Sequence, residues 1–163
     1  MHYLLGDLVP KNVASFQDLK YNDPDKWEYT KGLYKYISKY PTSSKVYYDV
    51  GLKLKELGLE KGVVLPPVRK HAYILPSGKR DSYHIMKRMM ERHITDDEIR
   101  GFMEKAKCMF VQWGGERQLF ISDAGSAVIT KVEDDWIFKT AWKAIDNDEE
   151  FEKIIEVLKN AGL

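Results

Sequence analysis

Apolar side chains recur at three- and four-residue intervals in two stretches of the N-terminal third, the spacing of an amphipathic helix. Asp23-Pro24 is a helix-start signal for the first stretch, and Pro41 ends it. The second stretch covers 46–57, and Gly58 follows as a C-terminal cap. The pattern predicts a helical hairpin in this part of the chain.

Helical spacing returns in the middle of the chain. Ser82 is placed as an N-cap, and Ile85 and Met89 belong to an apolar stripe. Thr95 is followed three residues later by Glu98, which is the capping-box spacing, just before a second apolar stripe. We therefore expect two consecutive helices here.

Short runs rich in β-branched and aromatic residues come next, separated by Gly-Gly, Asp-Ala-Gly and Glu-Asp-Asp turns. They cover 108–113, 117–122, 126–132 and 136–142. This spacing is typical of antiparallel hairpins. A further strand is expected at 71–75, and Asp146 or Asn147 is expected to cap a last helix that Gly162 follows.

These elements predict an α+β fold: an N-terminal helical region, then two helices packed on a four- to five-stranded antiparallel sheet, and a C-terminal helix. The segment 62–67, GVVLPP, indicates a linker or boundary because a Pro-Pro pair cannot continue a helix or a central strand. We expect a helical region at 1–65 and an α+β domain at 66–163.

Charge is unevenly distributed along the 163 residues, although 26 Lys and Arg nearly cancel 25 Asp and Glu. From 69 to 107 there are 10 basic residues against 6 acidic ones, and from 133 to 156 there are 3 against 9. A basic middle third fits a phosphate-bearing partner. Solvated helix faces produce the same counts, so charge alone does not choose between these interpretations.

Cys108 is the only cysteine, so the chain forms no internal disulfide. We therefore expect the protein to act in the reducing cytoplasm. The residue is interpreted as a small buried hydrophobe. No apolar run approaches the ~20 residues of a membrane span. Phosphate-loop, dinucleotide and paired metal-ligand motifs are missing from the sequence, so no nucleotide cofactor, metal or other cofactor is expected. Delivery as part of a larger protein remains compatible with these features.

The first of the two middle helices has one flank suited to an anion. At ~100° per residue, Arg88 and Arg92 lie roughly 40° and 80° from His84, so an imidazole and two cations share this flank. His93 lies about 180° away. Such a flank fits a phosphate, although surface helices commonly carry the same residues for solvation.

Motifs in this region carry a resemblance. The run S82-x-H84-x-x-x-R88-M-x-x-R92-x-I-T95-x-x-E98-I resembles the signature of bacterial and phage-borne ribonuclease-like domains of the barnase/EndoU/colicin/RelE superfamily. The segments 125–129 and 137–142 resemble that family's closing strands, which end in a hydrophobic-x-T-x-aromatic motif. The match covers about residues 70 to 145. Many family members carry glycine at the position of His93, so the joint between the helices is expected to differ here.

The resemblance implies a metal-independent endoribonuclease in which the RNA 2′-hydroxyl attacks the adjacent phosphorus. It assigns His84 as acid or base, Arg88 as phosphate clamp and Thr140 as a hydroxyl ligand of the phosphate. Arg92 either supports the phosphate or forms only a salt bridge. Further RNA contacts are expected from three residues: Lys139, Arg117 and Trp142.

Two points stay open in this assignment. The second proton-transfer group is one of five residues: His71, Tyr83, His93, Lys79 and Arg117. Strand alternation predicts that Thr140 shares a face with Phe138, Trp136 and Trp142, a base-stacking platform or simply the core side, while Lys139 points the other way.

The implied partners are RNA, with tRNA among the candidate targets, and an acidic immunity or antitoxin protein that neutralises a toxin. The alternative is a non-catalytic binding protein of phage or mobile-element origin that engages a host protein or RNA. It is favoured by the open second catalytic group and by the helical region at 1–65, which the resemblance does not cover. An α+β domain of unassigned function is the third interpretation.

Overall fold

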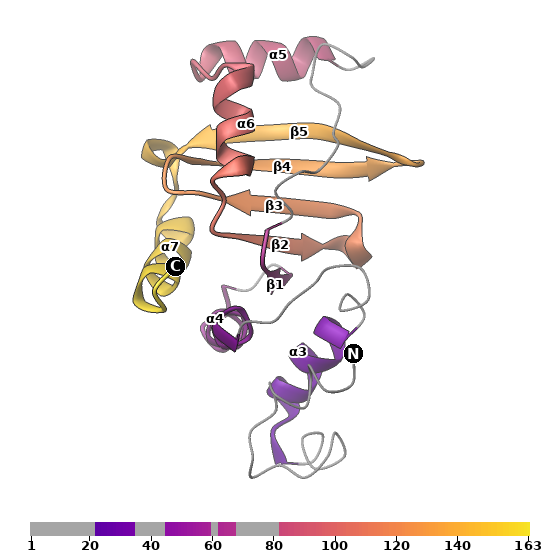
Figure 1. Ribbon diagram of the computed structural model, residues 1–163, viewed down its shortest axis with the longest axis vertical. Coiled ribbons are helices and arrows are strands. Elements are labelled where there is room, and N and C mark those ends of the chain that lie inside the picture. The colour runs from indigo at the N-terminus through magenta and orange to yellow at the C-terminus, as the bar shows by residue number, and fades with distance from the viewer. Residues whose placement is uncertain (1–21, 35–44, 60–61, 68–81) are drawn as a thin grey trace.

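The computed structural model describes residues 22–34, 45–59, 62–67 and 82–163. Within them an α+β fold is confirmed, with a five-stranded antiparallel sheet in the order β1-β2-β3-β4-β5 (Figure 1). The strands are β1 Val63–Leu65, β2 Cys108–Gln112, β3 Arg117–Ile121, β4 Gly125–Val132 and β5 Asp135–Lys143. The α-helices are α3 Pro24–Tyr34, α4 Lys45–Glu56, α5 Ser82–Glu91, α6 Asp96–Glu104 and α7 Glu149–Asn160. No helix in these ranges is long and apolar enough to cross a membrane.

Each face of the sheet is packed against different helices. Helices α5 and α6 cover one face, where they form a core with Met109, Phe120, Ile129 and Phe138. The other face carries Phe110, Leu119 and Val128, which pack with Ile154 and Leu158 of α7 and with Val50 and Leu54 of α4. Helix α5 lies beside β5, the outermost strand (Figure 1).

The N-terminal helices α3 and α4 share these cores with the sheet. Tyr29 and Tyr48 are buried in the same core cluster as the apolar side chains of α6, and the Tyr29 hydroxyl accepts a hydrogen bond of 3.1 Å from the backbone N–H of Val64. The interpretation of 62–67 as a linker is wrong, because Val63–Leu65 pair with β2 as an edge strand. Pro66 and Pro67 follow this short strand, where no ladder hydrogen bonds are required of them. The predicted boundary between a helical region at 1–65 and an α+β domain at 66–163 falls directly after β1.

Short-range sequence signals predicted most of the other helices and strands correctly. The predicted capping box of α6 is confirmed, since the Thr95 side chain accepts from the Glu98 backbone and the Glu98 side chain accepts from the Thr95 backbone. The predicted cap of the last helix is wrong: Ala144–Asp146 form a 3-10 turn, and Asp148 caps α7 by accepting a bond of 2.7 Å from the Phe151 N–H. The predicted strand at 71–75 lies outside the described residues.

A β-bulge in β5 changes which side chains share a face. Val128 pairs with Thr140, but the next residue, Ile129, pairs with Phe138, so Lys139 is an extra residue in the ladder. The bulge reverses the alternation of side chains along the strand. The prediction that Thr140 shares a face with Phe138 and Trp136 is therefore wrong. Phe138 and Trp136 pack in the core beneath α6, whereas Trp142, two residues after Thr140, packs beside α7.

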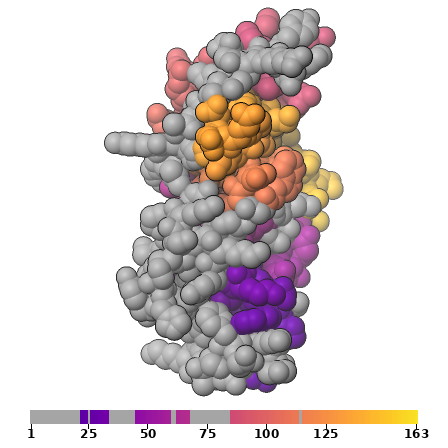
Figure 2. Space-filling model, turned by 90° about the vertical axis from the view of Figure 1, so that its right-hand side faces the viewer, coloured from indigo at the N-terminus to yellow at the C-terminus, as the bar shows by residue number. Residues whose placement is uncertain are grey.

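The turns of two hairpins meet at one end of the sheet. The backbone N–H of Lys131 donates to the carbonyl of Glu116 at 2.8 Å, which joins β4 to the β2–β3 turn. Figure 2 shows both turns at the molecular surface, the β4–β5 hairpin in orange next to the β2–β3 turn in coral. This end of the sheet is accessible from outside.

Candidate functional site

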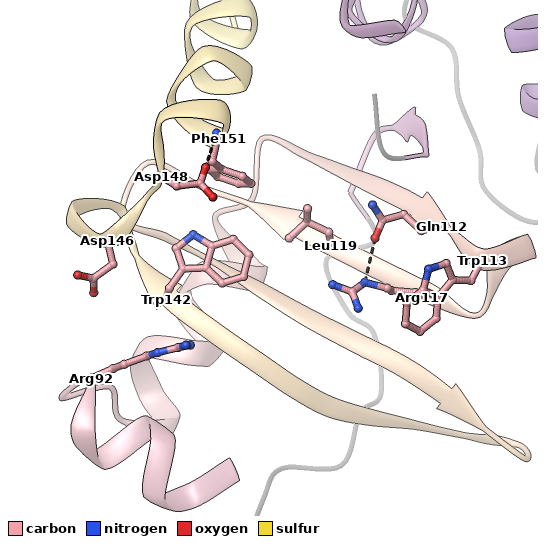
Figure 3. A pocket seen from close by; sticks show the side chains of 9 residues that line it. All are labelled: Arg92, Gln112, Trp113, Arg117, Leu119, Trp142, Asp146, Asp148 and Phe151. Carbon is pink, nitrogen blue, oxygen red and sulfur yellow. Dashed lines mark hydrogen bonds between the residues drawn. The ribbon is translucent and has the colours of Figure 1, made fainter. Parts of the chain in front are cut away.

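The α7 side of the sheet contains a hollow of about 560 Å³ that α7 does not fill. Figure 3 shows it between the end of α5, strands β2 to β5 and the start of α7. The lining residues are Arg92, Gln112, Trp113, Arg117, Leu119, Trp142, Asp146, Asp148 and Phe151. Three of the residues expected to contact RNA, Arg92, Arg117 and Trp142, thus meet in one place.

Arg92 reaches this hollow from the opposite side of the sheet. It lies at the end of α5, and its Nη1 donates to the Thr140 hydroxyl at 3.0 Å and to the Ala141 carbonyl at 2.7 Å. The carbonyl belongs to an outermost strand, so no neighbouring strand competes for it. The guanidinium closes the rim of the hollow and contacts the Thr140 hydroxyl directly. Its hydrogen-bond partners within the described residues are neutral groups, not a carboxylate.

A left-handed turn ends α5 directly after Arg92. His93 has φ 55°, and its N–H donates to the Met90 carbonyl, while the Ile94 N–H donates to the Met89 carbonyl. This pair of bonds is the Schellman motif, in which glycine is the usual left-handed residue. His93 therefore holds a left-handed conformation that glycine adopts more readily.

Arg117 lies on β3 at the far end of the hollow from Asp146 and Asp148 (Figure 3). Its Nε donates to Gln112 Oε1 at 2.9 Å, and its guanidinium lies 4.7 Å from the centre of the Trp113 ring. Burial lowers the pKa of Arg117 because the surrounding protein removes part of its hydration. Among the described residues, no carboxylate lies within ion-pair distance of it. A partly desolvated cation of this kind gains from an incoming anion.

Trp113 was missed by the sequence analysis. It begins the turn Trp113–Gly115 between β2 and β3, has φ 52° and leaves 68% of its surface exposed. In the sequence, only the two glycines of the WGG turn were interpreted, as a hairpin signal. The signal that could have identified Trp113 was its position four residues before Arg117. Left-handed backbone at a bulky residue is rare and costs free energy, which marks the position as a candidate functional residue.

Trp142 is held rigidly at the other end. Its Nε1 donates to Asn147 Oδ1 at 2.8 Å, and its ring meets Phe151 edge-on with 5.3 Å between centroids. The indole therefore forms a fixed wall of the hollow, close to the carboxylates of Asp146 and Asp148 (Figure 3). Base stacking is less suited to this side chain than to Trp113, whose ring is exposed.

The remaining predicted residues lie along α5 or outside the hollow. His84 and Arg88 occupy helix α5 about two turns and one turn before Arg92. Arg88 is exposed, and the side chain of His84 is not among those that the structure describes. Lys139 is exposed in the bulge and does not line the hollow.

Of the candidates for the second proton-transfer group, Arg117 lines the hollow and His93 is exposed at the end of α5. The structure does not describe His71, Lys79 or the side chain of Tyr83. Cys108 is fully buried, and burial raises the pKa of its thiol to about 12. The interpretation of Cys108 as a buried hydrophobe is confirmed.

No protein-family model, curated protein or solved structure matches this chain.

Proposed function

We propose that this chain is a metal-independent endoribonuclease-like domain of toxin or phage type that binds RNA across the hollow and the adjoining flank of α5. The observation that carries the proposal is the hydrogen bond between Arg92 and Thr140. These two motif residues are 48 positions apart in the sequence, yet they form a hydrogen bond at the rim of the hollow. Arg117 and two tryptophans also line this hollow. Guanidinium groups beside aromatic rings suit the phosphates and bases of RNA.

The Arg92 contact also prepares Thr140 as a donor. Because the Thr140 oxygen accepts a hydrogen bond from Arg92, its own O–H is directed elsewhere and can donate to a phosphoryl oxygen. Arg92 itself then acts as a positioning residue through Thr140. This supports the hydroxyl role that the family resemblance implies.

In the proposed reaction the 2′-hydroxyl loses its proton to a base and its oxygen attacks the adjacent phosphorus. The bond to the 5′-oxygen breaks, and an acid returns a proton to that oxygen, leaving a 2′,3′-cyclic phosphate and a 5′-hydroxyl. His84 serves one of these proton transfers, because an imidazole titrates near neutral pH. Arg88, one helical turn before Arg92, and the Thr140 hydroxyl stabilise the charge that gathers on the phosphoryl oxygens.

The test is incubation of the purified chain with total RNA and with tRNA in EDTA, followed by mapping of the fragment ends. We expect cyclic phosphate ends from the native chain, no cleavage by His84→Ala, and a loss of roughly tenfold or more in rate for Thr140→Val. Arg100→Gln is the matched control, because Arg100 is an exposed cation on α6 paired only with Asp97 among the described residues. Full activity of His84→Ala would overturn the catalytic assignment.

A non-catalytic binding protein is the second candidate. It is favoured by one observation: among the described residues, the hollow is lined by arginines, aromatic residues, aspartates, a glutamine and a leucine, with no imidazole or lysine. Tight binding of RNA by a folded native chain that leaves that RNA intact would favour this candidate. Capture of an acidic neutralising protein by the native chain, lost on Arg117→Gln, would instead support the toxin proposal.

A further inference from the structure

The turn between β2 and β3 places its strain at a tryptophan although glycines were available. Trp113 adopts φ 52°, while the next two residues are both glycine. A left-handed conformation costs free energy at a residue with a side chain, because the Cβ crowds the backbone. Burial does not offset this cost, because Trp113 keeps 68% of its surface exposed.

The same turn holds the ring against a cation. Arg117 lies 4.7 Å from the ring centre, and the Gln112 side chain fixes the guanidinium by accepting from Nε at 2.9 Å. With Nε engaged, the two terminal nitrogens present the planar fork that binds two oxygens of a phosphate. Ring and fork are therefore oriented by the same strand pair.

The surrounding backbone makes this pair rigid. Gln112 and Arg117 are partners in the β2–β3 ladder, and the Glu116 N–H donates to the Trp113 carbonyl at 3.2 Å. The Glu116 carbonyl in turn accepts from the Lys131 N–H on β4 at 2.8 Å. A turn connected to three strands loses little entropy when a ligand binds.

We propose that Trp113 and Arg117 form a subsite for one unpaired nucleotide of single-stranded RNA, in which the base stacks on the indole and the adjacent phosphate binds the guanidinium. A base inside a duplex has both faces covered by its neighbours, so stacking on Trp113 selects an unpaired nucleotide. The subsite lies at the opposite end of the hollow from the two aspartates, where an anion is least opposed (Figure 3). The inference rests on the proposed function only in taking RNA as the ligand.

The experiment measures binding separately from cleavage. The probe is a short fluorescein-labelled 2′-O-methyl oligoadenylate, which lacks the free 2′-hydroxyl nucleophile and stays intact with the native chain. Fluorescence anisotropy gives the dissociation constant, and the same oligomer annealed to its complement gives the value for a duplex. We expect the single strand to bind at least roughly tenfold more tightly than the duplex.

Matched variants separate the ring from the turn. Trp113→Gly removes the ring and also relieves the left-handed strain, so the fold is retained, which thermal unfolding verifies. We expect it to weaken binding by about tenfold or more, and Trp113→Phe to restore most of the loss. Arg117→Gln should weaken binding and lower the salt dependence of log Kd by about one unit, whereas Arg100→Gln should not.

An abasic oligomer of the same length provides the decisive comparison. Its binding should be unaffected by Trp113→Gly and still weakened by Arg117→Gln, because it retains phosphates and lacks bases. Equal loss on both ligands, or no loss on either, would overturn the stacking subsite.

Failure of this inference and failure of the proposed function give different results. Cleavage of unmodified RNA with no dependence of binding on Trp113 overturns the subsite and leaves the ribonuclease proposal standing. Trp113-dependent binding without cleavage overturns the catalytic proposal and supports the subsite. Absence of binding to any RNA overturns both, and a protein partner then becomes the candidate ligand.

Discussion

Arg92 and Thr140 join the end of α5 to the outermost strand of the sheet. One nitrogen, Nη1 of Arg92, donates both to the Thr140 hydroxyl and to the Ala141 carbonyl, at 3.0 and 2.7 Å. The residues come from opposite sides of the sheet, so this contact connects the helical flank carrying His84 and Arg88 with the hollow. Stability and function are both expected to depend on it.

Replacing Arg92 with Met keeps the apolar stem and removes the donors. We expect a loss of about 1–2 kcal/mol in the free energy of unfolding, because two hydrogen bonds from a charged group disappear. Urea denaturation measures the change. Arg100→Met, which removes an exposed cation on α6, should stay within about 0.5 kcal/mol of the native chain. Equal effects of the two substitutions would show that the Arg92 contacts do not stabilise the fold.

Replacing His93 with Gly should stabilise the chain. His93 holds φ 55° at the end of α5, where glycine adopts the left-handed conformation without steric cost. The expected gain is about 1 kcal/mol in the free energy of unfolding, seen as a higher midpoint in urea. His93→Ala retains the strain and serves as the control. A gain for alanine equal to that for glycine would mean that the histidine side chain, and not the backbone, is unfavourable.

Gly125 at the start of β4 has no space for a side chain. A Cβ there would lie 2.5 Å from Phe102 Cζ and 2.5 Å from the Trp142 carbonyl oxygen. Gly125→Ala should therefore destabilise the chain by roughly 2 kcal/mol or more. Gly101 on α6 provides the control, because a Cβ there would meet nothing within 4 Å. Gly101→Ala should gain about 0.5–1 kcal/mol as a helix-interior substitution, and thermal unfolding compares the two.

Cys108 should make stability fall at alkaline pH. Burial raises the pKa of the folded thiol from 9.0 to about 12, so above about pH 9 the unfolded chain loses a proton that the folded chain keeps. The contribution of this raised pKa to the free energy of unfolding is complete below pH 9 and is lost by about pH 12. At about pH 10.5 the native chain should have lost roughly 2 kcal/mol relative to Cys108→Ala. Urea unfolding of both proteins across this range is the measurement, and a difference that stays constant with pH would contradict it.

The elements that sequence predicted well are those specified by nearby residues. Thr95 and Glu98 are three positions apart and cap α6 through each other, so their spacing alone is informative. The Gly-Gly and Asp-Ala-Gly turns likewise fixed the hairpins between β2, β3 and β4 within a residue or two. Val63–Leu65 was missed because a three-residue strand is specified by its partner β2, which is distant in the sequence.

The candidate site was less predictable for the same reason. Arg92, Arg117 and Trp142 were named separately, but their convergence depends on how α5 and α7 dock on the sheet. The grouping of Thr140 with Phe138 and Trp136 on one face was wrong, because neither the bulge at Lys139 nor the resulting reversal has a signature in the strand's own residues. Asp148 was missed as the cap of α7 because Asp146 and Asn147, two residues and one residue earlier, offer equivalent chemistry.

The bulge at Lys139 changes which side chains of β5 lie on each face of the sheet. A β5 of the same length without the bulge would carry Thr140 on the same side as Phe138, beneath α6, and Ala141 on the α7 side. The bulge therefore decides whether the Thr140 hydroxyl lies on the α6 side or on the α7 side of the sheet. Deleting Lys139 would make Phe138 and Thr140 consecutive in a regular ladder, so the bulge would disappear while Thr140 and Ala141 kept their present faces.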